Sequence, residues 1–242
     1  MKLLPSIAIA AAIWLALFPI SSVDAYYHLA TGRRILDDRA IPTRGVGSAT
    51  FGQAAWHDNE WGFQVLAALV GRTEREPGGV LVLTPLGRVG LVAMRAAALA
   101  ATLALLAATM ARLGAGPVLG ASGVWLAAFL TFGNLFWDVR PQILSYAALA
   151  ALCFLLERAR EGRRFALPAC LGVIALWANV HGAFVIGLGL LVCEAAGEWI
   201  EARRAAPHRA RAWRLTATAL GAPIAACLNP SGFKQLVHPF VY

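Results

Sequence analysis

The chain has 242 residues, of which 59% are hydrophobic and only 14% are charged. Soluble domains are typically about 45–50% apolar and about 25% charged, so this composition argues against a soluble domain. The net charge of +8 at pH 7 does not indicate a nucleic-acid-binding protein, because the arginines lie in short clusters between apolar runs and form no binding motif.

Apolar runs recur along the chain at lengths that suit a bilayer. The hydrocarbon core is about 30 Å thick, which takes about 20 residues of helix to cross. Shorter runs also cross when a helix tilts or when its polar ends reach the interface. In chain order, the runs predict about seven spans, near residues 3–23, 89–110, 118–136, 143–156, 167–178, 183–199 and 215–228. We therefore expect an all-α polytopic transmembrane helix bundle that forms one domain over residues 1–242.

A long connection, residues 24–86, separates the first two expected spans. Its first part, up to Asp38, has a helical pattern, and the apolar segment 61–70 is too short to span a bilayer. We expect both segments to form helices in the membrane interface.

The basic residues predict which side each connection faces. Lys2 precedes the first expected span, and arginines crowd the connections 157–165 and 201–214, which follow the fourth and sixth spans. Basic residues are enriched on the cytoplasmic side, so all three clusters fit a cytoplasmic N-terminus and an outer 24–86 connection. If 61–70 were a true span, both basic connections would lie outside, which argues against that alternative.

The polar residues that are hardest to explain then lie on the outer side. They are Asp24, His28, His57, Asp58, Glu60, Asp138, Arg140, Gln142, Asn179, His181, Lys234 and His238. Acidic groups, histidines and cations that meet at one membrane face are what a polar site requires. Some have structural alternatives: Asp24 as a helix cap, His28 as a packed interfacial side chain, and Asp138 with Arg140 as an ion pair.

Other features narrow the chemistry. Arg95 interrupts the second expected span, so its guanidinium must face the bundle interior or reach outward to the interface. The sequence has no Walker loop, dinucleotide fingerprint or nucleophile elbow, so ATP and NAD are not indicated as cofactors. The cysteines lie inside apolar runs without metal-like spacing, and they indicate neither a disulfide nor a zinc site: Cys153, Cys170, Cys193 and Cys227.

The segment after the first expected span resembles a known family. The stretch Asp24-Ala-Tyr-Tyr-His-Leu-Ala-Thr-Gly-Arg is similar to the start of the first outer loop in polytopic glycosyltransferases of the C superfamily. Similarity to a bacterial group of this superfamily continues at Pro42, residues 56–64, Arg140-Pro141-Gln142, Asn179-Val180-His181-Gly182 and Asn229-Pro230-Ser231-Gly232. The resemblance covers almost the whole chain.

This resemblance implies an enzyme of the cell envelope that moves a sugar from a polyprenyl-phosphate carrier to an acceptor at the outer face of the bacterial inner membrane. In such enzymes an acidic residue of the first outer loop acts as catalytic base or binds a divalent metal, Mg²⁺ or Mn²⁺, and Asp24 occupies the matching position. Many members have a second acidic residue beside it, where this chain has Ala25, so Asp58 and Glu60 are its expected partners at a metal. Charge-assisted bonds would bind the carrier phosphate. The expected substrate-binding residues are His28, His57, Arg140, Gln142, Asn179, His181 and Lys234.

Alternative functions stay open. A non-catalytic membrane scaffold or a truncated inactive relative would keep the fold without activity. A transporter of lipid-linked substrates would need more intramembrane ionisable residues than Arg95.

The sequence stops at Tyr242 as though entering another helix, which predicts a truncated C-terminus. The first apolar run also resembles a signal peptide cleaved after Ala25, but its length exceeds the about 7–15 residues of a signal core and favours a retained span.

Overall fold

The computed structural model describes residues 3–15, 17, 20, 23–45, 55–130 and 139–237. Helix makes up 72% of the structure, and the described residues form no closed sheet. The expected all-α class is therefore confirmed.

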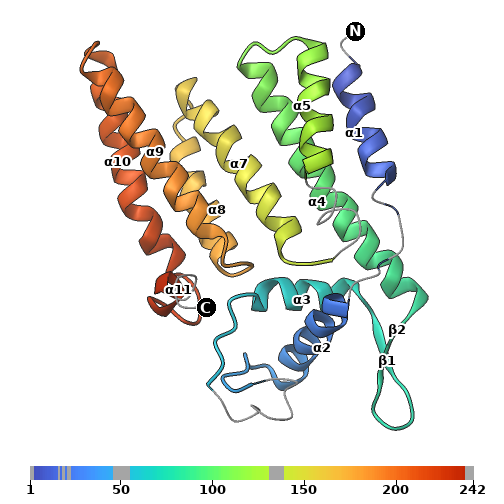
Figure 1. Cartoon of the computed structure of the whole chain (residues 1–242). Helices are drawn as coiled ribbons and strands as arrows, with labels where there is room; N and C mark the ends of the chain where they lie inside the picture. Colours follow the sequence, from blue (N-terminus) through green and yellow to red (C-terminus); the bar gives the residue numbers. More distant parts are fainter. Residues whose placement is uncertain are drawn as a thin grey trace.

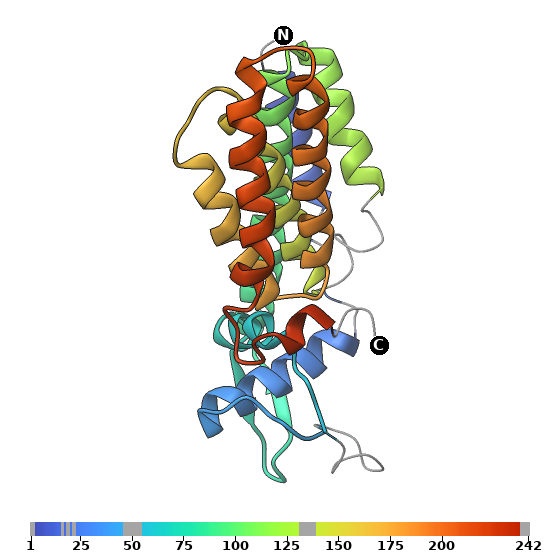
Figure 2. The ribbon, with the colours of Figure 1, turned by 90° about the vertical axis from the view of Figure 1, so that its left-hand side faces the viewer.

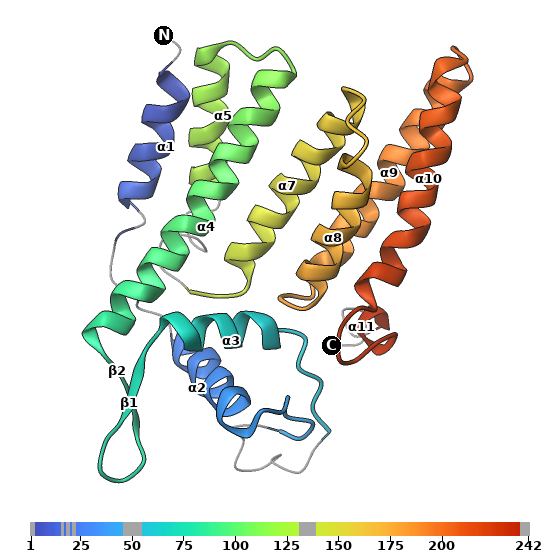
Figure 3. The same cartoon turned by 180° about the vertical axis from the view of Figure 1, so that it is seen from behind.

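The expected spans correspond to long helices that run side by side along one direction (Figures 1 and 3). One apolar core joins the N-terminal helices and a second joins the C-terminal ones, and α7 contributes Ile143 to the first core and Leu152 to the second. The long helices are α1 Leu4–Leu15, α4 Pro85–Arg112, α5 Pro117–Leu130, α7 Gln142–Arg160, α8 Ala166–Ala178, α9 Phe184–Ala202 and α10 Pro207–Ala226.

Length and composition identify two described helices, α4 and α7, that could cross a membrane unaided. The helices α1, α5 and α8 are apolar but have only 12, 14 and 13 residues. The helices α9 and α10 have 19 and 20 residues, but charged side chains lie along their ends near the turn that joins them. Among the described residues, two helices are thus long and apolar enough to span a membrane, and the predicted set of seven spans stays a prediction.

The first expected span differs from its prediction. The helix α1 ends at Leu15, and a separate helix, α2 Val23–Asp38, begins where the span was expected to end. Pro19, which falls between these two ranges in the sequence, lies outside the described residues. The last residues of the third expected span, 131–136, lie outside the described residues.

The long helices expose apolar side chains and bury a charged one. Trp14, Phe129, Leu176 and Ile224 are all between 72% and 76% exposed. Arg95 in α4 is 0% exposed, so its guanidinium faces the interior, which is one of the two orientations expected for it. An apolar exterior this broad is unusual for a soluble monomer.

A second layer crosses one end of the long helices (Figure 2). It contains α2, α3 Trp61–Val70, the antiparallel hairpin of β1 Thr73–Arg75 and β2 Leu81–Leu83, and the short α11 Lys234–Val237. The helix α3 begins and ends at the residues predicted for the short apolar helix. The hairpin is not predicted from the sequence, and its turn uses Gly78 and Gly79 at φ values of 100° and 82° that favour glycine.

The helices α2 and α3 cross at a glycine. A Cβ atom on Gly32 would lie 1.9 Å from the backbone oxygen of Gln64, so only glycine permits this approach. Phe63 of α3 is fully buried and packs edge-on against His28 of α2, with ring centroids 5.1 Å apart. This packing fixes Glu60, the residue directly before α3, relative to α2.

Candidate active site

The polar residues singled out from the sequence gather where the second layer meets the long helices. Asp138 and His238, which were also expected here, lie outside the described residues. The second layer contributes Asp24, His28, His57, Asp58, Glu60 and Lys234, and the ends of the long helices contribute Arg140, Gln142, Asn179 and His181.

Glu60 lies between two histidines of this group. Its carboxylate oxygens lie 3.9 Å from Nδ1 of His28 and 3.8 Å from Nε2 of His181. These distances are too long for direct hydrogen bonds, but they leave both ring nitrogens facing the carboxylate. Burial, followed by repulsion from the carboxylates of Asp58 and Asp24, raises the pKa of Glu60 to about 7. A carboxyl group with this pKa exchanges its proton near neutral pH.

The orientation of His181 is set from behind by Ser145 and Trp177. The Ser145 Oγ lies 2.8 Å from Nδ1 of His181 and accepts a 2.8 Å hydrogen bond from Nε1 of Trp177. The Ser145 hydroxyl has one proton to donate and two lone pairs that accept, so it can serve both rings at once. Burial lowers the pKa of His181 and favours the neutral ring, whose Nε2 faces Glu60.

Asp24 forms an ion pair with Arg140, which precedes α7. The aspartate lies within the first turn of α2 rather than at the cap position, and there its charge complements the helix dipole. The side chains of Asp24 and Arg140 are 49% and 39% exposed, so a ligand can reach the pair. The alternative pairing of Arg140 with Asp138 concerns a residue outside the described part of the chain.

A cavity of about 540 Å³ lies beside Glu60. Asp58 is 6% exposed, and its Oδ1 accepts hydrogen bonds from the backbone N–H of Glu60 at 3.1 Å and from Nε2 of Gln64 at 3.2 Å. Its Oδ2 is buried without a hydrogen-bond partner among the described residues, and burial raises the pKa of the Asp58 carboxyl. Carboxyl groups, aromatic rings and a lysine in one cavity suit a ligand rich in hydroxyl groups. The lining residues are Tyr27, Ala55, Trp56, His57, Asp58, Asn59, Glu60, Gln64 and Lys234.

Two residues expected to bind substrate are engaged by contacts within the protein. The ring nitrogens of His57 lie 3.0 Å from Oε1 of Gln235 and 2.9 Å from Oγ of Ser231. Asn179 accepts a 3.1 Å hydrogen bond from Nε1 of Trp61 and donates to two backbone carbonyl oxygens, at 2.8 Å and 2.9 Å. These bonds tie the segment before α3 to the ends of α8 and α10, so both side chains position the site.

Sequence reasoning missed Ser145 and Gln64. Ser145 is a polar residue inside the apolar run of α7, and such a residue needs a hydrogen-bond partner. Gln64 lies four residues after Glu60, which places it on the same side of α3 as the site. Gln142, which was expected, begins α7, and its Oε1 is buried without a hydrogen bond in the described part of the protein.

Metal binding by Asp24, Asp58 and Glu60 stays a prediction. Among the described residues, no group of three or more histidine, cysteine, aspartate and glutamate side chains is arranged to hold a metal ion. The raised pKa values of Asp58 and Glu60 also favour protonated forms, which are poor metal ligands. The Mg²⁺ or Mn²⁺ that the resemblance implies would need these carboxyl groups in their ionised forms.

Comparisons with known proteins give no assignment. No protein-family model, curated protein or solved structure matches the chain. The function is therefore argued from the residues of the site.

Proposed function

We propose that the chain is a membrane glycosyltransferase that moves a sugar from a polyprenyl-phosphate carrier to a hydroxyl group of an acceptor. The observation that carries the proposal is the placement of Glu60 between His28 and His181. A polar cavity lies beside this carboxyl group, and the ion pair of Asp24 with Arg140 lies close enough to influence its pKa. Sugar transfer needs a proton acceptor for the attacking hydroxyl and cations for the departing phosphate, and this arrangement supplies both.

The proposal includes a bundle in which all the long helices cross the bacterial inner membrane. The apolar exterior of these helices and the two helices of full spanning length support it. The shorter α1, α5 and α8 would cross with local thinning of the bilayer. The basic connections 157–165 and 201–214 lie at the end of the helices opposite to α2 and α3 (Figures 1 and 2). The preference of basic residues for the cytoplasm then puts the candidate site at the outer face.

An apolar cavity of about 570 Å³ supports the binding of a lipid carrier. It lies against α2 and the beginning of α4, and its lining includes Leu17, Ile20, Tyr26, Val89 and Arg88. Tyr26 is two residues from Asp24, so a prenyl chain in this cavity would direct its phosphate toward the pair of Asp24 with Arg140. An arginine binds phosphate oxygens through charge-assisted, often paired hydrogen bonds, so Arg140 can bind the carrier phosphate there.

In the proposed reaction the acceptor oxygen forms a bond to the anomeric carbon, and the bond from that carbon to the carrier phosphate oxygen breaks. Glu60 takes the proton of the acceptor hydroxyl, and the phosphate leaves with the bonding electron pair. Arg140 and Lys234 stabilise the negative charge that develops on the phosphate. Glu60 is favoured over Asp24 as the proton acceptor, because its pKa is near neutral and it lines the polar cavity, whereas Asp24 is not among the lining residues.

The test is sugar transfer by the full chain in vesicles, with a panel of radiolabelled polyprenyl-phosphate sugars and a mixture of acceptors. We expect transfer by the unaltered protein and a rate about 10²–10⁴-fold lower for Glu60→Gln, which is the usual contribution of a general base. Glu76→Gln is the matched control, because Glu76 lies in the exposed hairpin turn away from the cavity. No transfer from any donor, or an unchanged rate for Glu60→Gln, would overturn the proposal.

A non-catalytic membrane scaffold is the second candidate. The internal contacts that occupy His57 and Asn179 favour it, because hydrogen bonds within the protein already use the polar atoms of both side chains. A scaffold needs the fold but no proton transfer. Cells that carry Glu60→Gln in place of the native chain would then keep a normal envelope, whereas loss of an enzyme would alter it.

A further inference from the structure

A basic pocket lies at the end of the helices opposite the candidate active site. Its volume is about 280 Å³, and it lies between α8 and α10, beside the segment that precedes α8. Guanidinium groups gathered around so small a space repel one another unless an anion lies among them. Four of its lining residues are arginines, namely Arg163, Arg164, Arg211 and Arg214.

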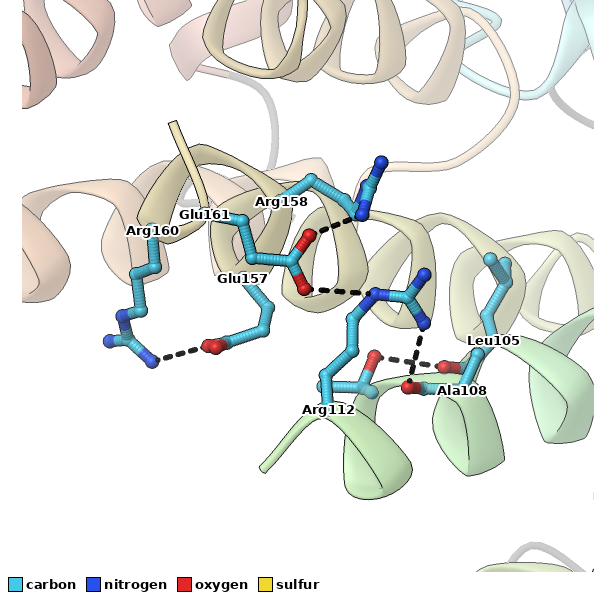
Figure 4. Close-up of polar contacts among 8 residues, drawn as sticks. Leu105, Ala108, Arg112, Glu157, Arg158, Arg160 and Glu161 are labelled. Carbon is cyan, nitrogen blue, oxygen red and sulfur yellow. Dashed lines mark hydrogen bonds and ion pairs between the residues drawn. The ribbon is translucent and has the colours of Figure 1, made fainter. Parts of the chain in front are cut away.

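The carboxylates near this end are already paired with cations. Glu161 contacts Arg112 at 3.2 Å and also contacts Arg158 (Figure 4). Glu157 contacts Arg160 at 3.0 Å in the same view. The described carboxylates of α7, α9 and the turns that follow these helices all form such pairs, namely Glu157, Glu161, Glu194, Glu198 and Glu201.

The pocket arginines are left without a full set of internal partners. Glu198 lies 3.5 Å from Nη1 of Arg211, but the Arg211 Nε is buried without a hydrogen-bond partner among the described residues. Within the described ranges, no carboxylate forms an ion pair with Arg163, Arg164 or Arg214. The pocket therefore combines four arginines, one buried Nε without a hydrogen-bond partner among the described residues, and no carboxylate paired with three of its four cations in the described part of the chain.

We propose that this pocket binds the phosphate group of an anionic glycerophospholipid. Arginine presents paired N–H donors that match phosphate oxygens, and basic pockets between membrane helices on the cytoplasmic side suit anionic headgroups. The pocket is also lined by Leu167 and Pro168, and the nearby Phe165 and Trp213 are 58% and 62% exposed, as suits side chains at the lipid interface. The site rests on the membrane arrangement proposed above, but it is independent of sugar transfer.

The test is native mass spectrometry of the full chain in detergent, titrated with phosphatidylglycerol and, separately, with phosphatidylcholine. We expect one phosphatidylglycerol to be retained in preference to phosphatidylcholine. The double substitution Arg164→Gln with Arg214→Gln is expected to weaken that retention by about 30-fold, from the contribution of two basic residues to binding an anionic headgroup. The matched control is Arg203→Gln with Arg209→Gln, which removes the same charge from exposed arginines just after α9 and in the first turn of α10 that do not line the pocket.

The control variant distinguishes a specific binding site from a general attraction of anionic lipid to positive charge. Retention within about threefold of the unaltered protein for the control, and loss for the pocket variant, would support the site. Equal losses in the two variants would overturn it. Displacement of the lipid by millimolar inorganic phosphate would also overturn the lipid assignment, because it would show that the pocket selects free phosphate. Arg163→Gln with Arg164→Gln, on the exposed segment before α8, repeats the test without altering α10.

Discussion

Substitution of Gly32 by alanine tests the packing on which the candidate site depends. The new Cβ atom would lie 1.9 Å from the backbone oxygen of Gln64, whereas ordinary contact begins at 3.4 Å, so α2 and α3 would have to separate by about 1.5 Å. Overpacking of this kind typically costs about 1–3 kcal/mol. Alanine recovers about 0.8–1 kcal/mol of that through its higher helix propensity. The contact is with backbone, which cannot move aside as a side chain can, so we expect the upper end of that cost and a net loss of about 2 kcal/mol, which lowers Tm by about 4–8 °C in a chain of this size.

The assay is thermal unfolding of the purified protein, followed by tryptophan fluorescence. Gly172→Ala in α8 is the matched control, because its Cβ would meet nothing within 4 Å, and it is expected to leave Tm unchanged or slightly raised. Separation of α2 from α3 would also move Glu60 away from His28, and a displacement of about 1 Å can lower a catalysed rate about 10²-fold. An unchanged Tm and an unchanged transfer rate for Gly32→Ala would refute this account of the crossing.

Three further predictions concern the same end of the molecule, and thermal unfolding checks each. The pKa of Glu60 is raised from 4.5 to about 7, so the folded state binds this proton more tightly and loses stability as pH rises between those values. Glu60→Gln should therefore raise Tm near about pH 8 and leave it unchanged near about pH 4, and a constant difference would contradict the raised pKa. Ser145→Ala removes the hydroxyl that contacts both His181 and Trp177, and it should lower the free energy of unfolding by about 1–3 kcal/mol. The control Thr102→Ala should lower it less, because the Thr102 hydroxyl bonds to a carbonyl of its own helix. Equal losses in the two variants would refute the shared role of Ser145. Asn179→Ala leaves the indole N–H of Trp61 without its acceptor and should also lower the free energy of unfolding by about 1–3 kcal/mol. An unchanged Tm would show that this hydrogen bond does not stabilise the fold.

The helices were predictable where an apolar run has clear ends. The range of α3 equals its prediction, and α8 begins one residue before its predicted start. Charged or glycine-rich segments flank both runs, so the change in composition marks the boundary. The first span was less predictable, because the hydrophobicity of residues 3–23 continues across the break between α1 and α2 and only Pro19 signals it.

The set of polar residues at the site was predictable, but its arrangement was not. The family resemblance directs attention to Asp24, whose catalytic role stays a prediction, whereas the structure puts Glu60 between His28 and His181. That placement follows from the close approach of α2 to α3 at Gly32 and from the turn after α8. Contacts between segments this distant in the sequence leave no local periodicity, so one sequence alone does not reveal them.

The pH dependence of sugar transfer tests the role of Glu60 most directly. With a donor that the unaltered protein accepts, the account predicts a rate that rises with pH through an apparent pKa of about 7 and then levels off, because the ionised Glu60 takes the acceptor proton. Glu60→Gln should lose this rise, and Asp24→Asn should keep it at a lower rate. The same rise in Glu60→Gln, or its loss in Asp24→Asn alone, would contradict the account and return the proton acceptor to Asp24.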